Sequence, residues 1–80
     1  MTLEVKIVGF DRPEHPAFEV DVPQRAVNKV KKIAEVPSTD PDLMGSYPLN
    51  PRQLALIADA AHLTIDPSKF SYFLEAYEKV

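Results

Sequence analysis

Two segments in which apolar and charged side chains alternate constrain the fold of this chain more than any other feature. Residues 3–10 and 17–22 both follow a period of two, which is typical of strands with one buried and one solvated face. The side chains expected to point inward are Leu3, Val5, Ile7, Phe18, Val20 and Val22, and those expected to point outward are Glu4, Lys6, Glu19 and Asp21. Residues 11–16 contain two prolines, which cannot donate ladder hydrogen bonds, so they predict a loop. The pattern predicts an antiparallel hairpin.

After this hairpin the apolar period changes from two to about 3.6. Pro23 suits a first helical turn, and an amphipathic stripe follows it, which predicts a helix over residues 23–35 that Pro37 stops. Residues 37–50 are the longest irregular stretch and, as a long loop, a candidate functional segment. Asn50 followed by Pro51 is an N-cap signal, and it predicts a second helix over residues 51–62.

The C-terminal segment allows two interpretations. Phe70, Phe73, Leu74 and Tyr77 follow helical spacing, and Asp66-Pro67 repeats the start signal, so we expect a helix over residues 67–78. A strand over 70–77 is the alternative, because aromatic side chains favour strands.

The expected fold class is therefore α+β, an N-terminal antiparallel hairpin packed against about three helices in a single domain over residues 1–80. The expected core consists of Leu3, Val5, Ile7, Phe18, Val20, Val30, Ile33, Leu54, Ile57, Phe70, Phe73 and Leu74.

Composition narrows the classes of function. The chain has 80 residues, no cysteine and a net charge of −3. Nucleic-acid-binding domains usually carry a net positive charge. Arg25, Lys29 and Lys32 lie on one helical face, but they do not outweigh the acidic residues of the chain. We therefore expect no direct nucleic-acid binding. The N-terminus has no apolar signal region, and no segment approaches the ~20 apolar residues of a membrane span, which leads us to expect a cytoplasmic protein without membrane contact.

The sequence also lacks the usual constellations of a chemical site. The two histidines, His15 and His62, are far apart and cysteine is absent, so we expect no metal site and no cofactor. No serine stands in a nucleophile elbow, and the two glycines cannot form a phosphate-binding loop. We therefore expect no catalytic residues and no enzyme activity. Asp59 and Glu75, the best acid–base candidates, fall on helix faces opposite the apolar stripes, where solvated surface is the simpler interpretation.

Protein–protein recognition fits the composition better. Three tyrosines are numerous for this length, and tyrosine is enriched in interfaces. Tyr77 belongs to the expected core stripe, Tyr72 lies off it as an exposed anchor, and Tyr47 lies either in an interface or against the sheet. The candidate partner-binding residues are Glu19, Asp21, Asp40, Asp42, Tyr47, Tyr72 and Glu75.

The order of these segments, with Ser46-Tyr47-Pro48-Leu49 before one helix and Tyr72-Phe73-Leu74-Glu75-Ala76-Tyr77 at the end, resembles a family of small bacterial immunity proteins. These proteins are encoded beside the toxins of contact-dependent growth inhibition and other polymorphic toxin systems. The resemblance implies a protein that binds and neutralises a cognate toxin domain, with a nuclease as the expected toxin, by occluding its active site or substrate path. The motif residues would shape the fold more than contact the partner.

The acidic balance is compatible with this function, because a toxin that cleaves nucleic acid presents a basic cleft and complementary fields speed association. Two alternatives of other classes remain. One is a non-catalytic interaction module or a subunit of a larger assembly, and the other is a small acid–base enzyme built on Asp59 or Glu75.

Overall fold

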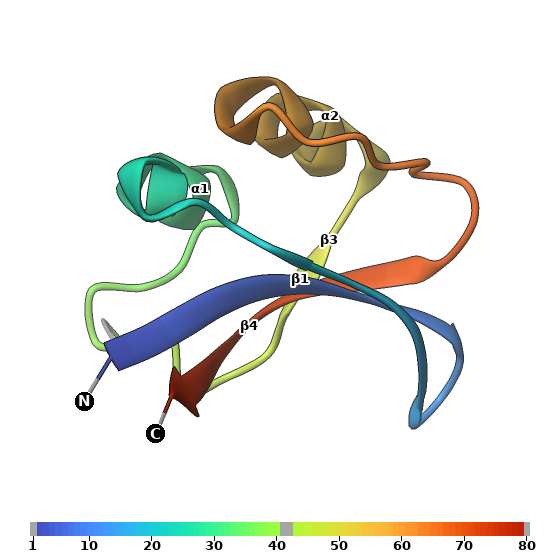
Figure 1. Ribbon diagram of the computed structural model, residues 1–80, viewed down its shortest axis with the longest axis horizontal. Helices are drawn as coiled ribbons and strands as arrows, with labels where there is room; N and C mark the ends of the chain where they lie inside the picture. The colour runs from blue at the N-terminus through green and yellow to red at the C-terminus, as the bar shows by residue number, and fades with distance from the viewer. Residues whose placement is uncertain (1, 41–42, 80) are drawn as a thin grey trace.

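The computed structural model describes residues 2–40 and 43–79, which form a four-stranded antiparallel sheet with two α-helices on one side of it (Figure 1). The strands are β1 (Thr2–Arg12), β2 (His15–Asp21), β3 (Tyr47–Leu49) and β4 (Ser71–Lys79), and their order in the sheet is β2-β1-β4-β3. The first and last strands of the chain therefore lie in the middle. The expected α+β class is confirmed, whereas the hairpin is half of a larger sheet rather than a separate layer.

The N-terminal hairpin is confirmed and is longer than the sequence indicated. Its turn contains only Pro13 and Glu14, and the backbone of Glu14 is left-handed with φ 62°. The second proline of the expected loop, Pro16, lies within β2 opposite Phe10. Because β2 is an edge strand, this proline has no neighbour on one side that would need its missing N–H. Two irregularities in the register, on either side of Phe10, accommodate the change of pairing.

The helix expected over residues 23–35 is shorter and has two parts. A 3₁₀ turn over Gln24–Ala26 leads into α1 (Val27–Ile33). The chain leaves the helix at Glu35, whose backbone is left-handed with φ 60°, and the N–H of Val36 donates back to the carbonyl of Lys31 at 3.0 Å. This C-terminal cap ends the helix before Pro37 is reached.

The second expected helix is α2 (Pro51–Ala61), and its N-terminal signal is confirmed. Asn50 accepts from the Gln53 N–H at 2.8 Å, and Gln53 Oε1 accepts from the Asn50 N–H at 2.9 Å, which is a reciprocal capping box. The helix ends at His62 in a left-handed conformation, φ 56°. Among the described residues, no helix is long and apolar enough to cross a membrane.

The helix expected over residues 67–78 is wrong, and the strand considered as its alternative is present as β4. Asp66 does accept from the Ser68 N–H at 3.0 Å, as an N-cap would, but the chain makes a turn there and then extends. Pairing with most of β1, from Thr2↔Lys79 to Phe10↔Ser71, outweighs the local helix signal. The short strand β3, inside the stretch expected to be irregular, pairs with the other side of β4.

The core lies between the sheet and the two helices. Its buried members include Val5, Ile7, Val30, Leu54, Ile57 and Leu74, all predicted, together with the unpredicted Tyr72. Phe18, Val20, Ile33 and Phe70 pack partly buried against it. Gly9 makes room for these rings, because a Cβ there would lie 3.0 Å from Tyr72 Cε1 and 3.2 Å from Phe18 Cβ.

Two expected core residues are elsewhere. Leu3, near the start of β1, is 40% exposed. Phe73 is only partly buried and is not a member of the helix-side core, because in β4 it points to the opposite side from Tyr72 and Leu74. The helix expected for this segment would have put Phe73 and Leu74 on the same face. In a strand, neighbouring side chains point to opposite faces of the sheet.

Candidate functional site

The side of the sheet away from the helices is the candidate functional site, and we call it the open face. Alternation along each strand and the pairing register assign its residues. They are Glu4, Lys6, Val8 and Phe10 of β1, Glu19 and Asp21 of β2, and Ser71, Phe73, Glu75 and Tyr77 of β4. Neither α-helix covers this side (Figure 1).

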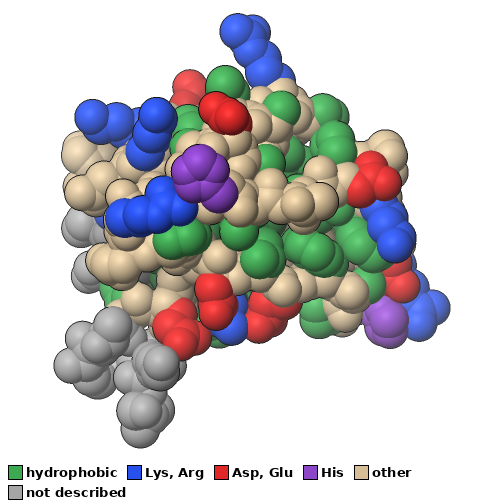
Figure 2. Space-filling view, turned by 45° about the horizontal axis from the view of Figure 1, so that its top comes forward, with side chains coloured by type: hydrophobic (Ala, Val, Ile, Leu, Met, Phe, Trp, Pro, Cys, Tyr) green, Lys and Arg blue, Asp and Glu red, His purple; other side chains and the backbone are tan. Residues whose placement is uncertain are grey.

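Charge is divided between the two sides of the molecule. Arg25, Lys29, Lys31 and Lys32 all belong to the 3₁₀ turn and α1, which lie on the helix side. Figure 2 turns that side toward the viewer and shows Lys and Arg gathered at the left, with a group of acidic side chains along the lower edge. The open face carries four carboxylates and one lysine among its described side chains. It is therefore the acidic side of the protein.

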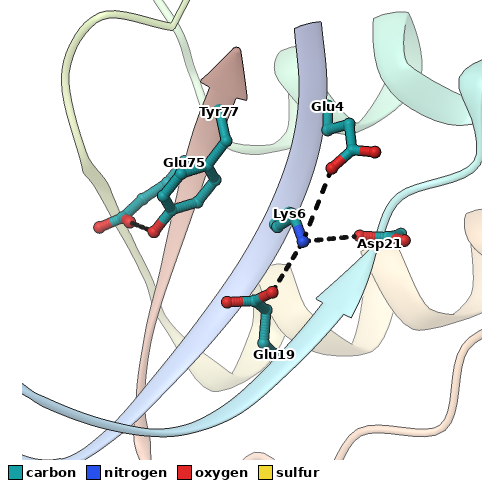
Figure 3. A network of polar contacts seen from close by, with 6 residues as sticks. All are labelled: Glu4, Lys6, Glu19, Asp21, Glu75 and Tyr77. Atoms are coloured by element: carbon teal, nitrogen blue, oxygen red, sulfur yellow. Dashed lines mark hydrogen bonds and ion pairs between the residues drawn. The ribbon is translucent and has the colours of Figure 1, made fainter. Parts of the chain in front are cut away.

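Lys6 stands at the centre of these carboxylates (Figure 3). Its Nζ lies 2.7 Å from Glu19 Oε1, 3.3 Å from Asp21 Oδ1 and 3.7 Å from Glu4 Oε2. The hydrogen bond to Glu19 holds the pKa of Lys6 above its usual value. The lysine thus orders three acids that repel one another, and it neutralises only one of their charges.

Glu75 is held from two sides by hydroxyl groups. Tyr77 donates to its Oε1 at 2.6 Å, as Figure 3 shows, and Ser46 donates to its Oε2 at 2.7 Å. The hydrogen bond to Glu75 raises the pKa of Tyr77 to about 12. Tyr77 is 43% exposed, so the sequence-based assignment of this ring to the core is wrong.

An aromatic pair extends the open face toward the hairpin turn. The rings of Phe10 and Phe73 meet edge to face with centroids 5.6 Å apart and an angle of 83° between their planes. Together with the hairpin turn, Ser46 and Glu75 they line a pocket of about 520 Å³. Val8, between Phe73 and Glu19 in the register, is 1% exposed although no helix covers it.

Asp40 organises the loop that carries Ser46 to Glu75. Its carboxylate accepts from the N–H groups of Met44 at 2.7 Å and Gly45 at 3.0 Å, and from the hydroxyl of Tyr47. These hydrogen bonds, that of Tyr47 first, hold the pKa of Asp40 below its usual range. The hydrogen bond between Tyr47 and Asp40 also raises the pKa of Tyr47. Both oxygens of the Asp40 carboxylate therefore accept hydrogen bonds from the residues that follow it in the chain. Tyr47 packs partly buried against the core.

The structure brings three of the seven predicted contact residues, Glu19, Asp21 and Glu75, onto one surface. It separates Tyr72 from them. That ring is 3% exposed on the helix side, and its hydroxyl donates to the carbonyl of Asp66, so the expectation of an exposed anchor is wrong. Burial raises the pKa of Tyr72. Asp42 lies outside the described residues.

Sequence reasoning missed Phe10, Phe73 and Ser46 as parts of this surface. A strand interpretation of residues 70–77 would have found Phe73, because it puts Phe73, Glu75 and Tyr77 on one side and Tyr72 and Leu74 on the other. The pairing of Phe10 with Ser71 depends on strands about 60 residues apart and has no local signal.

The described residues contain no group of three or more His, Cys, Asp and Glu side chains arranged to hold a metal ion.

A family model described as "Domain of unknown function (DUF7683)" matches residues 4–75. The chain belongs to the DUF7683 family. Comparison with curated proteins and with solved structures gave no match. The DUF7683 range includes Lys6, its three acids and Glu75, and ends before Tyr77. The description of the family states no activity.

Proposed function

We propose that this protein is a non-catalytic immunity protein that binds a basic toxin domain, a nuclease of a polymorphic toxin system, through the open face. The observation that carries the proposal is the combination of acidic and aromatic side chains on a sheet surface that neither helix covers. The resemblance of the two aromatic motifs to immunity proteins supports the class of partner. A nuclease meets its substrate in the cytoplasm, and inhibition would take place there.

Charge complementarity indicates that the partner of the open face is basic. Lys6 fixes Glu4, Glu19 and Asp21 in place before a partner arrives, and their summed charge stays negative. A cleft that binds nucleic acid is lined by Lys and Arg, which this cluster attracts. Ordered acids lose little side-chain freedom on binding, which favours affinity as well as association rate.

Aromatic area supplies the second component of an interface. Phe10, Phe73 and Tyr77 offer rigid apolar surface beside the charges, and residues of this kind dominate the binding energy of many interfaces. The Asp40 carboxylate, with its hydrogen bonds to Met44, Gly45 and Tyr47, supports the loop next to this surface, so its role is to position Ser46.

The test is growth of cells that produce a toxin domain identified among the gene's neighbours, with and without this protein. We expect survival only when the protein is present. If cells die equally with soluble protein present, the immunity function is wrong and the interaction-module alternative replaces it.

A charge reversal tests the surface. Glu19→Lys should slow association with the toxin domain on the order of 10-fold at low salt and weaken its salt dependence, since steering charges act on the on-rate. Asp59→Lys, an equal reversal of an exposed acid on α2, is the matched control. Stopped-flow association rates measure both. Equal slowing by the two variants would mean that the open face is not the binding surface.

A further inference from the structure

The pocket of about 520 Å³ on the open face has a shape and chemistry that the acidic surface alone does not explain. Three separate parts of the chain form it: residues 10–14, from the end of β1 through the hairpin turn, then Ser46 before β3, and β4 with Ser71, Phe73 and Glu75. Its volume is within the roughly 300–1,000 Å³ of ligand sites. A partner side chain can enter it from the solvent side of the sheet.

The aromatic and acidic parts of the pocket fit one kind of group. Phe10 and Phe73 provide apolar walls and ring surfaces, and Glu75 provides a negative charge. Cations bind favourably over aromatic rings, and a guanidinium does so with its flat face. Asp11 at the end of β1 and Glu14 in the turn add acidic charge. Arg12 is the cation among the lining residues, and its side chain is exposed.

Glu75 is oriented for a two-point contact. Each of its oxygens accepts one hydrogen bond, from Tyr77 and from Ser46 respectively, and a carboxylate oxygen has a second lone pair. The two hydroxyl groups therefore hold the carboxylate in place, and the second lone pair of each oxygen can accept from a further donor. A guanidinium donates two parallel N–H groups with this spacing, and an ammonium does not.

We propose that this pocket binds an arginine side chain of the partner, with its guanidinium on Glu75 and its stem against the paired rings of Phe10 and Phe73. The inference rests on the proposed function for the source of the arginine, a basic toxin domain. The pocket residues that would bind the guanidinium all come from this chain, so a small arginine probe can test the binding without the toxin.

The probe is N-acetyl-arginine methylamide, titrated into ¹⁵N-labelled protein and followed by amide chemical shifts. N-acetyl-citrulline methylamide, which has the same shape without the charge, is the matched control. We expect shifts centred on residues 10, 73 and 75, and binding of the citrulline probe weaker on the order of 10-fold, because charge-assisted hydrogen bonds are lost. Equal binding of the two probes, or shifts elsewhere on the protein, would overturn the proposal.

Two substitutions locate the contact. Glu75→Gln keeps the size of the side chain and should weaken arginine-probe binding on the order of 10-fold, whereas Asp59→Asn on α2 should not change it. Dispersion of the amide spectrum confirms that each variant is folded. Unchanged binding in Glu75→Gln would remove Glu75 from the site and contradict the proposal.

The toxin complex separates this inference from the proposed function. Faster dissociation of the complex with Glu75→Gln supports a partner arginine in the pocket, and an unchanged dissociation rate contradicts it. If the arginine probe binds but the toxin is not neutralised, the pocket chemistry stands and the immunity function fails. If the toxin is neutralised but the probe does not bind, the pocket inference fails alone.

Discussion

At the scale of single residues, Asp40 shows how an acid in a candidate binding loop can serve the fold. Its position in a long polar segment predicted a partner contact, but three donors from residues 44, 45 and 47 converge on its carboxylate. No sequence pattern specifies this arrangement in advance, because it depends on the path of the loop. The acids on β2 were easier to place, since strict alternation put Glu19 and Asp21 on the solvated side.

Asp40 makes the stability of the protein depend on pH. Its pKa is lower in the folded than in the unfolded state, so the stabilisation is present above the unfolded-state value and is lost as the pH falls through the folded-state value. Asp40→Asn should therefore lower the urea midpoint at pH 7, and the difference from wild type should shrink below about pH 4. Urea unfolding across this range measures it. Asp59→Asn serves as the control, and a difference that stays constant with pH would contradict the assignment.

At the scale of elements, the segment 70–77 is where local and long-range information disagree. Its apolar residues satisfy both a period of 3.6 and a period of two, and the turn at Asp66 imitates a helix start. Pairing with β1 decides the outcome, and this partner is about 60 residues away in the chain. By contrast, β1, β2 and α2 could be predicted, because their signals lie within the segments themselves.

The strand assignment predicts that two neighbouring residues differ in their contribution to stability. Leu74→Ala should cost about 2–5 kcal/mol, since Leu74 is 0% exposed in the core. Phe73→Ala should cost clearly less, because that ring is partly exposed on the open face and packs mainly against Phe10. Denaturant unfolding of the two variants gives the comparison. A larger loss for Phe73→Ala would contradict the side assigned to each residue.

The N-terminal cap of α2 gives a second prediction at this scale. Asn50→Ala removes the side-chain acceptor of the capping box and should destabilise the protein by about 1 kcal/mol. Asn50→Ser retains an acceptor and should restore most of the loss. Thermal unfolding of both variants measures the effect, and equal losses would show that the cap hydrogen bond does not matter.

At the scale of the whole molecule, the sheet order places the strands with the greatest separation in sequence side by side. Because β1 and β4 have neighbours on both sides, their amides should be the slowest to exchange with solvent, whereas amides of the edge strand β2 should exchange faster. Hydrogen exchange followed by mass spectrometry or NMR tests this order. Equal protection of β2 and β4 would argue against a central β4.

The same strand order has a consequence for synthesis on the ribosome. The strand that completes the middle of the sheet is the last of the four to be translated. Until residues 71–79 emerge, the nascent β1–β2 hairpin has an unpaired edge, its apolar side includes Val5 and Ile7, and β3 has no strand to pair with. Such edges promote association between chains. A translational pause before residue 71 would therefore leave an aggregation-prone intermediate that chaperones must protect.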